Sequence, residues 1–222
     1  MKLIDLTHTL SPEIPTFGGS CGFTMSLTCD YKDCTEPNLF RIQKLEMKAG
    51  LGTHMDAPAH CIEGGKSIDA LALEDLVTDC VVIDASAEAN ENFVIMPSVI
   101  ESFEKEHGTI SPNAFVIFDT GWSTRWGKPK EYINDHAYPC VDPSTAQLLL
   151  ERNIAGIGID TLSADNGGKD FPVHRLILGA GKYLVENVAN THMLPPIGAK
   201  IFVLPIKIKD GTEAPIRLIA SI

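Results

Sequence analysis

The chain lacks several features that define whole classes of protein. No apolar run reaches the roughly 18–20 residues that a membrane-spanning helix needs, and the N-terminal MKLIDLTHTLSPEIP has no signal-peptide character. We therefore expect a cytoplasmic protein. Basic residues are scarce, with 18 Lys and Arg against 29 Asp and Glu and a formal net charge of −11. This excess of negative charge argues against binding to nucleic acid or to an anionic membrane surface.

Cysteine pairs with the C-x-x-C spacing are also absent. The six cysteines are Cys21, Cys29, Cys34, Cys61, Cys80 and Cys140. Because no secretory signal precedes them, we expect reduced thiols rather than a disulfide framework. A zinc site made by the first three of them is an unfavoured alternative, since their spacing lacks the tight knuckle of structural zinc sites.

The composition that remains is that of a globular protein, with 44% hydrophobic and 21% charged residues. Short apolar runs predict buried strands at 80–84, 114–119, 155–160 and 183–188. Further strands are expected at 2–6, 39–49, 200–209 and 215–220, with the Asp-Gly pair in 209–215 as a hairpin turn. Helices are expected at 97–108, 142–153 and 171–181. No repeat or linker interrupts this order, so we expect one α/β domain, residues 1–222, with a mixed sheet.

The segment GLGTHMDAPAHC, residues 50–61, carries the strongest chemical signal. Gly52 and Pro58 oppose a helix, so the segment is expected to be extended. His54 and Asp56 then point to the same face, which suits two ligands of one zinc, manganese or iron ion. His60 follows the bend at Pro58 and either binds a second ion or carries protons. The alternative is that all three are isolated polar residues in a loop.

Two ligands do not complete a metal site, so others must come from elsewhere in the chain. His174 lies in an apolar segment, and Glu186 lies inside the apolar strand YLVENV. A buried carboxylate requires a cation or a charged partner, so Glu186 is either a metal ligand or paired with Lys or Arg. Asp160, which ends the strand AGIGID, is placed to hydrogen-bond a metal ligand or the substrate.

Together these motifs resemble the cyclase family of metal-dependent hydrolases, whose members include kynurenine formamidase and isatin hydrolase. The segment GTHMDAPAH resembles the family pattern His-x-Gly-Thr-His-x-Asp-x-Pro-x-His. The similarity continues through IDLTHTLSPEIPTF, DTGW, GIDTLSAD, VHRLILGAGKYLVENV and LPIKI, over nearly the whole chain. The resemblance implies a swivelling β/β/α fold and assembly into homodimers or larger homo-oligomers.

The resemblance also implies roles for individual residues. Its metal ligands correspond to His54, Asp56, His174 and Glu186, and its proton donor and acceptor corresponds to His60. The aromatic residue that contacts substrate corresponds to Phe17, while Trp122 is either a pocket wall or an ordinary core residue. We expect one or two divalent ions per chain, with zinc favoured over manganese.

The expected reaction is hydrolysis of a C–N bond in a small amide, an N-formyl arylamine or a cyclic imide or lactam, and lactones are further expected substrates. The N-formyl case corresponds to the arylformamidase step of tryptophan catabolism. A bound divalent ion lowers the pKa of a water ligand towards about 7 and polarises the carbonyl. His60, with a reference pKa near 6.5, takes the proton of that water and returns it to the leaving nitrogen.

One position departs from the family pattern. Gly50 stands where the first histidine of the motif belongs, which removes one ligand of a second ion. Three ligands remain for the first ion, and a water or Gln43 are candidates to fill the gap. Two alternatives therefore stay open. One is a relative that binds metal or a small ligand without turnover, and the other is a thiol enzyme that uses Cys61 beside His60.

Overall fold

The structure, a computed structural model, describes residues 1–18, 22–168 and 170–222. Its main sheet has the strand order β1-β12-β11-β5-β7-β9-β10-β4, and β12 also pairs with β4, so the sheet closes into a barrel. The strands are β1 (Leu3–Asp5), β4 (His54–Asp56), β5 (Val77–Asp84), β7 (Phe115–Asp119), β9 (Gly156–Ile159), β10 (Tyr183–Glu186), β11 (Ala199–Pro205) and β12 (Glu213–Ser221). Strands β5, β7, β9 and β10 are parallel, and the remaining pairings are antiparallel. The predicted mixed α/β class is confirmed.

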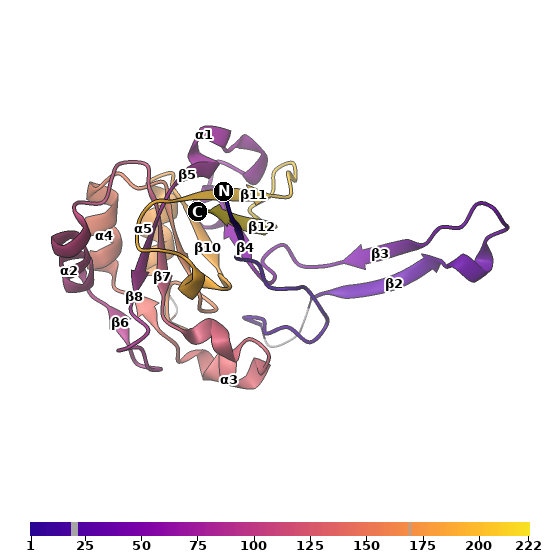
Figure 1. Ribbon diagram of the computed structural model, residues 1–222, viewed down its shortest axis with the longest axis horizontal. Helices are drawn as coiled ribbons and strands as arrows, with labels where there is room; N and C mark the ends of the chain where they lie inside the picture. Colours follow the sequence, from indigo (N-terminus) through magenta and orange to yellow (C-terminus); the bar gives the residue numbers. More distant parts are fainter. Residues whose placement is uncertain (19–21, 169) are drawn as a thin grey trace.

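Helices cover the outer face of the parallel strands (Figure 1). The helices on this face are α2 (Pro97–His107), α4 (Pro143–Glu151) and α5 (Pro172–Gly179), whereas the short helices α1 (Leu73–Leu76) and α3 (Pro129–Ile133) pack in other clusters. A small parallel pair, β6 (Val94–Ile95) and β8 (Cys140–Val141), lies beside them. Within the described ranges, no helix combines the length and the apolar character that crossing a bilayer requires.

The barrel core follows the two-residue period of the strands. On β7, Phe115 and Ile117 belong to the cluster inside the barrel, whereas Val116 and Phe118 pack against the helices outside. The two glycines of β9 pack against aromatic rings of the neighbouring strands. A Cβ at Gly158 would lie 3.0 Å from the Phe115 ring, closer than ordinary van der Waals contact, so the ring would have to shift to admit a side chain there.

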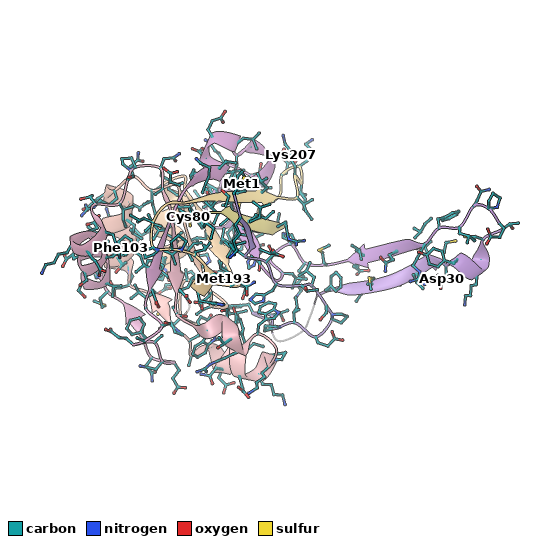
Figure 2. The ribbon with its side chains drawn as sticks, viewed as in Figure 1. Met1, Asp30, Cys80, Phe103, Met193 and Lys207 are labelled. Atoms are coloured by element: carbon teal, nitrogen blue, oxygen red, sulfur yellow. The ribbon has the colours of Figure 1, made fainter. Side chains whose placement is uncertain are left out.

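A hairpin of β2 (Thr24–Cys29) and β3 (Ile42–Glu46) forms a separate antiparallel pair. This hairpin, which we call the arm (residues 24–46), extends away from the barrel (Figure 1), with Asp30 near its far end (Figure 2). We predicted a strand over 39–49 but not β2, nor that the two strands would leave the body of the molecule. The arm has little apolar burial, so no core pattern marks it in the sequence.

Strand β4 is short, but it closes the barrel and thereby sets the geometry of the motif. It lies between β10 and β12, with His54 opposite Glu186 on one side and Asp56 opposite Glu213 on the other. Directly opposed residues of antiparallel strands project to the same face. The closure therefore brings four polar side chains together at one point of the barrel wall.

Candidate metal centre

The motif segment is extended over β4, as its glycine and proline predicted. Met55 is fully buried in the barrel core, so His54 and Asp56 project from the opposite face, towards α5. The Nδ1–H of His54 donates to the carbonyl of Gly52 at 2.9 Å, which leaves Nε2 free to bind an ion. Gly52 has φ of +61°, a conformation that glycine adopts without strain.

His174 from α5 and Glu186 from β10 meet the two motif residues. His174 Nε2 lies 3.4 Å from Asp56 Oδ2 and 3.2 Å from Glu186 Oε1. His54 Nε2 lies 3.5 Å from Asp56 Oδ1 and 3.6 Å from Glu186 Oε2. Two ligand atoms about 2.1 Å from a tetrahedral zinc ion are separated by about 3.4 Å. The structure thus brings the four predicted ligands into one neighbourhood, and the separations of these atoms are compatible with metal binding.

The burial of these carboxylates indicates that a cation belongs here. Asp56 is 1% exposed, and its Oδ1 has no hydrogen-bond partner among the described residues. An ionised oxygen in that position is costly unless a cation compensates it. Burial alone would lower the pKa of His54, but the carboxylates of Asp56 and Glu186 outweigh this effect and raise it. The donor set carries excess negative charge and fits a divalent ion.

Asp165 orients His174 from behind the donor atoms. Its Oδ2 accepts hydrogen bonds from His174 Nδ1, at 2.6 Å, and from the His174 backbone N–H, while Oδ1 accepts from the Val173 N–H. The ring is thereby held in the tautomer whose Nε2 can bind an ion. We did not predict this role. The only signal in the sequence is a polar turn, SADNGGKD, ahead of the helix.

Glu213 is the second contributor that sequence patterns missed. Its carboxylate, together with donor atoms of His54 and Asp56, forms a second group whose members lie within 4.8 Å of one another. Its Oε2 also lies 3.3 Å from Nδ1 of His60. That contact raises the pKa of His60 and leaves the other ring nitrogen of this partly exposed side chain for proton transfer.

A cavity of about 220 Å³ opens above the donor atoms. Phe17 and Phe171 form its aromatic wall, with ring centroids 6.0 Å apart, and the Phe171 ring stands edge-on to His174 at 5.7 Å. Phe17 thus lines the cavity, and its contact with substrate stays a prediction. Phe171 was not predicted. It sits at the start of α5 with φ of 41°, a conformation that costs a bulky residue about 1–2 kcal/mol.

Two further predicted site residues lie elsewhere. Trp122 is buried, donates from Nε1 to the Tyr132 carbonyl at 2.8 Å, and is not among the described residues that line the cavity. Of its two proposed roles, the structure gives it the core role. The Asp160 carboxylate accepts hydrogen bonds from Thr120 and Ser123, so it braces the turn after β7 instead of a donor side chain. Burial raises the pKa of Asp160 to about 6.

The geometry does not favour the remaining alternatives, which are a replacement ligand from Gln43, a nucleophilic Cys61 and a zinc site made by the first three cysteines. Gln43 lies on the exposed arm and donates to Met25 Sδ, so it does not fill the gap at Gly50. Loss of solvent raises the pKa of the Cys61 thiol, the opposite of what a nucleophilic cysteine requires. Cys29 and Cys34 also lie on the arm, with their sulfur atoms 3.9 Å apart, and Cys21 lies outside the described residues.

Comparison with known proteins places this arrangement in a family. The Cyclase family model, described as "Putative cyclase", matches residues 4–166. The chain belongs to the cyclase family. Among curated relatives, an isatin hydrolase of Roseibium aggregatum is 33% identical over 77% of this chain and 71% of its own length. A kynurenine formamidase of Salinibacter ruber is 27% identical over 99% of this chain and 97% of its own.

Solved cyclase-family structures show the same fold. Isatin hydrolase A from Ralstonia solanacearum superposes with a TM-score of 0.89 at 34% identity, covering 99% of this chain and 91% of that one. An isatin hydrolase bound to the product analogue thioisatinate superposes with a TM-score of 0.90 at 27% identity, with the same coverage. The predicted resemblance to cyclase-family hydrolases is confirmed. The roles of the individual site residues stay predictions.

Proposed function

We propose that this cyclase-family hydrolase uses a divalent ion, with zinc favoured over manganese, to open the C–N bond of a small, flat, aryl-fused lactam of the isatin type. The observation that carries the proposal is a donor cluster of imidazoles and carboxylates at the floor of a cavity walled by Phe17 and Phe171. Two aromatic side chains suit a planar substrate, and a volume of about 220 Å³ limits it to a small one.

The chain's own residues divide the remaining work. A bound divalent ion would supply a water of lowered pKa and a polarised carbonyl. His54, Asp56, His174 and Glu186 are the residues placed to hold that ion. His60, oriented by Glu213, takes the proton released as water adds to the carbonyl carbon. As the C–N bond breaks, His60 returns that proton to the nitrogen, so that the ring opens to an amine and a carboxylate.

A second candidate substrate is an N-formyl arylamine such as N-formylkynurenine. The relatives named kynurenine formamidase support it because they align over 95% or more of both chains, although at 25–27% identity. The isatin hydrolases of Roseibium aggregatum and Ralstonia solanacearum, at 33% and 34% identity, favour the cyclic amide.

The test is a hydrolysis panel with isatin and N-formylkynurenine, run on purified protein before and after removal of metal by a chelator. We expect faster turnover of isatin, loss of activity with chelator, and recovery when zinc or manganese is added back. Activity that persists with no bound metal would overturn the metal-dependent reaction. Faster turnover of N-formylkynurenine would move the proposal to the formamidase.

We also propose that the arm binds a second copy of this chain. Its two faces differ, because Met25, Leu27 and Leu45 lie on one face and Ser26 and Lys44 lie on the other. The three apolar side chains are each about half exposed. An isolated two-stranded hairpin is marginally stable in water, so an apolar face of this kind requires a partner.

Light scattering coupled to size exclusion measures this assembly. We expect a homodimer for the wild-type chain and a monomer for Leu27→Glu, which puts a charge on the apolar face. Ser26→Glu, on the polar face of the same strand, is the control and should leave the dimer intact. A wild-type monomer, or a Leu27→Glu dimer, would contradict the proposed role of the arm.

A further inference from the structure

The gap at Gly50 is closed by a residue from the other end of the chain. A Cβ atom built on Gly50 would collide with Glu213 Oε1 and would lie 3.4 Å from His54 Nε2. Position 50 therefore faces the donor cluster, as a histidine ligand there would. In this chain the carboxylate of Glu213 occupies the space into which a side chain at position 50 would project.

Backbone conformation does not explain the glycine. Gly50 lies outside the left-handed region of φ, unlike Gly52, and the described atoms that a Cβ at position 50 would approach most closely belong to Glu213. The two positions behave as alternatives, because only one of them can present a large side chain to His54 Nε2. A ligand side chain can therefore come either from position 50 or from position 213, but not from both.

The charges around Glu213 give a second, independent indication of a cation. Glu213 and Asp56 are directly opposed across the β12–β4 pair, where like charges repel. Asp56 Oδ1, which lies 3.5 Å from His54 Nε2, is a buried carboxylate oxygen that has no hydrogen-bond partner among the described residues. An ion held by His54, Asp56 and Glu213 would neutralise both carboxylates and satisfy that oxygen.

We propose that Glu213 replaces the missing motif histidine and completes a second metal site with His54 and Asp56. Asp56 bridges the two sites, since its Oδ1 faces His54 and its Oδ2 faces His174, the ligand of the first ion. Glu213 serves this site with Oε1, while Oε2 holds His60. The chain thus holds two divalent ions, and in the second site the carboxylate of Glu213 takes the place of the imidazole of the motif histidine. This inference rests on the proposed metal-dependent function.

Elemental analysis of protein saturated with zinc and desalted measures the number of ions per chain, independently of activity. We expect two ions for the wild-type chain and one for Glu213→Ala. The double substitution Gly50→His with Glu213→Ala restores a family-type ligand in the vacated space and should return the count to two. Glu213→Gln, which keeps the shape but not the charge, should bind the second ion at least tenfold more weakly.

A matched pair of glycine substitutions tests the same site without changing Glu213. Gly50→Ala displaces the Glu213 carboxylate and should lower the count towards one. Gly127→Ala, at a glycine whose added Cβ meets nothing within 4 Å, should keep two ions. Circular dichroism establishes that each variant is folded before its metal content is compared.

The outcomes separate this inference from the proposed function. A single ion in the wild-type chain that Glu213→Ala retains would overturn the second site and leave a one-ion hydrolase intact. Two ions in Glu213→Ala would also overturn the ligand role of Glu213. A wild-type chain that binds no ion and is indifferent to chelator would instead overturn the metal-dependent function itself.

Discussion

Asp165→Asn tests whether the orientation of one imidazole controls metal binding. Among the described residues, the hydrogen-bond partners of the Asp165 carboxylate are all donors: the backbone N–H groups of Val173 and His174 and the Nδ1–H of the His174 ring. An asparagine amide offers one acceptor and one donor. If its oxygen faces the Val173 N–H, its NH₂ group turns towards the His174 ring. Nδ1 must then accept, which moves the ring proton to Nε2 and blocks the ion.

The reverse orientation of the amide sets its NH₂ group against the Val173 N–H, so both orientations carry a cost. Substitution of a residue that hydrogen-bonds a metal-ligating histidine weakens metal binding or activity by about 10–100-fold. At about 1.36 kcal/mol for each factor of ten, that corresponds to about 1.4–2.7 kcal/mol of binding free energy. A further loss of about 1 kcal/mol in folding stability is expected, because the same carboxylate caps the first turn of α5.

Competition with a chromophoric chelator measures the zinc affinity of the variant. Asp142→Asn is the matched control, since it also removes a carboxylate from a helix N-terminus. The Asp142 side chain accepts from the Ser144 N–H of α4, and an asparagine oxygen can replace it there. We expect the control to bind zinc as the wild type does. Equal affinities for the two variants, within a factor of two, would refute the tautomer reasoning.

Three further expectations concern other parts of the chain. Asp56→Ala should lose metal and activity together, whereas His60→Ala should keep its metal and lose about 10²–10⁴-fold in kcat, and an unchanged kcat would remove His60 from the reaction. Burial lowers the pKa of His8, stacked on a tryptophan, to about 4. Above about pH 6.5 His8 is neutral in both the folded and the unfolded chain. As the pH drops to 4 the unfolded chain takes up the proton first, so the free energy of unfolding falls by up to about 3 kcal/mol. Denaturant unfolding should show a shallower pH slope for His8→Phe than for the wild type. Burial raises the pKa of Cys80 to about 12, so iodoacetamide should label Cys61 in the native protein and Cys80 only after unfolding.

Local sequence patterns identified the features that depend on local backbone geometry. Gly52 and Pro58 excluded a helix, and the two-residue period of a strand then placed His54 and Asp56 on one face with Met55 on the other. Helix α2 begins at Pro97 and ends before Gly108, as the capping residues predicted. The cost of burying an unpaired carboxylate was enough to single out Glu186 inside an apolar strand.

Local sequence patterns did not predict that the arm would extend away from the barrel. Its residues alternate as any strand does, but nothing in that alternation states whether the strand will join the barrel or leave it. Only their exposure in the folded chain distinguishes Leu27 and Leu45 from core residues of the same type.

The sequence by itself determined the resemblance to the family, through motifs spread along the chain, and the extended motif, through residue type and short-range spacing. The four predicted metal ligands follow from that resemblance. Tertiary structure alone decided that Asp165 orients His174 and that Glu213 stands over Gly50. Both contacts join segments with no periodic relation, and the second exists only because β12 pairs with β4 to close the barrel. Closure is set by how the whole core packs, and no local stretch of sequence encodes it.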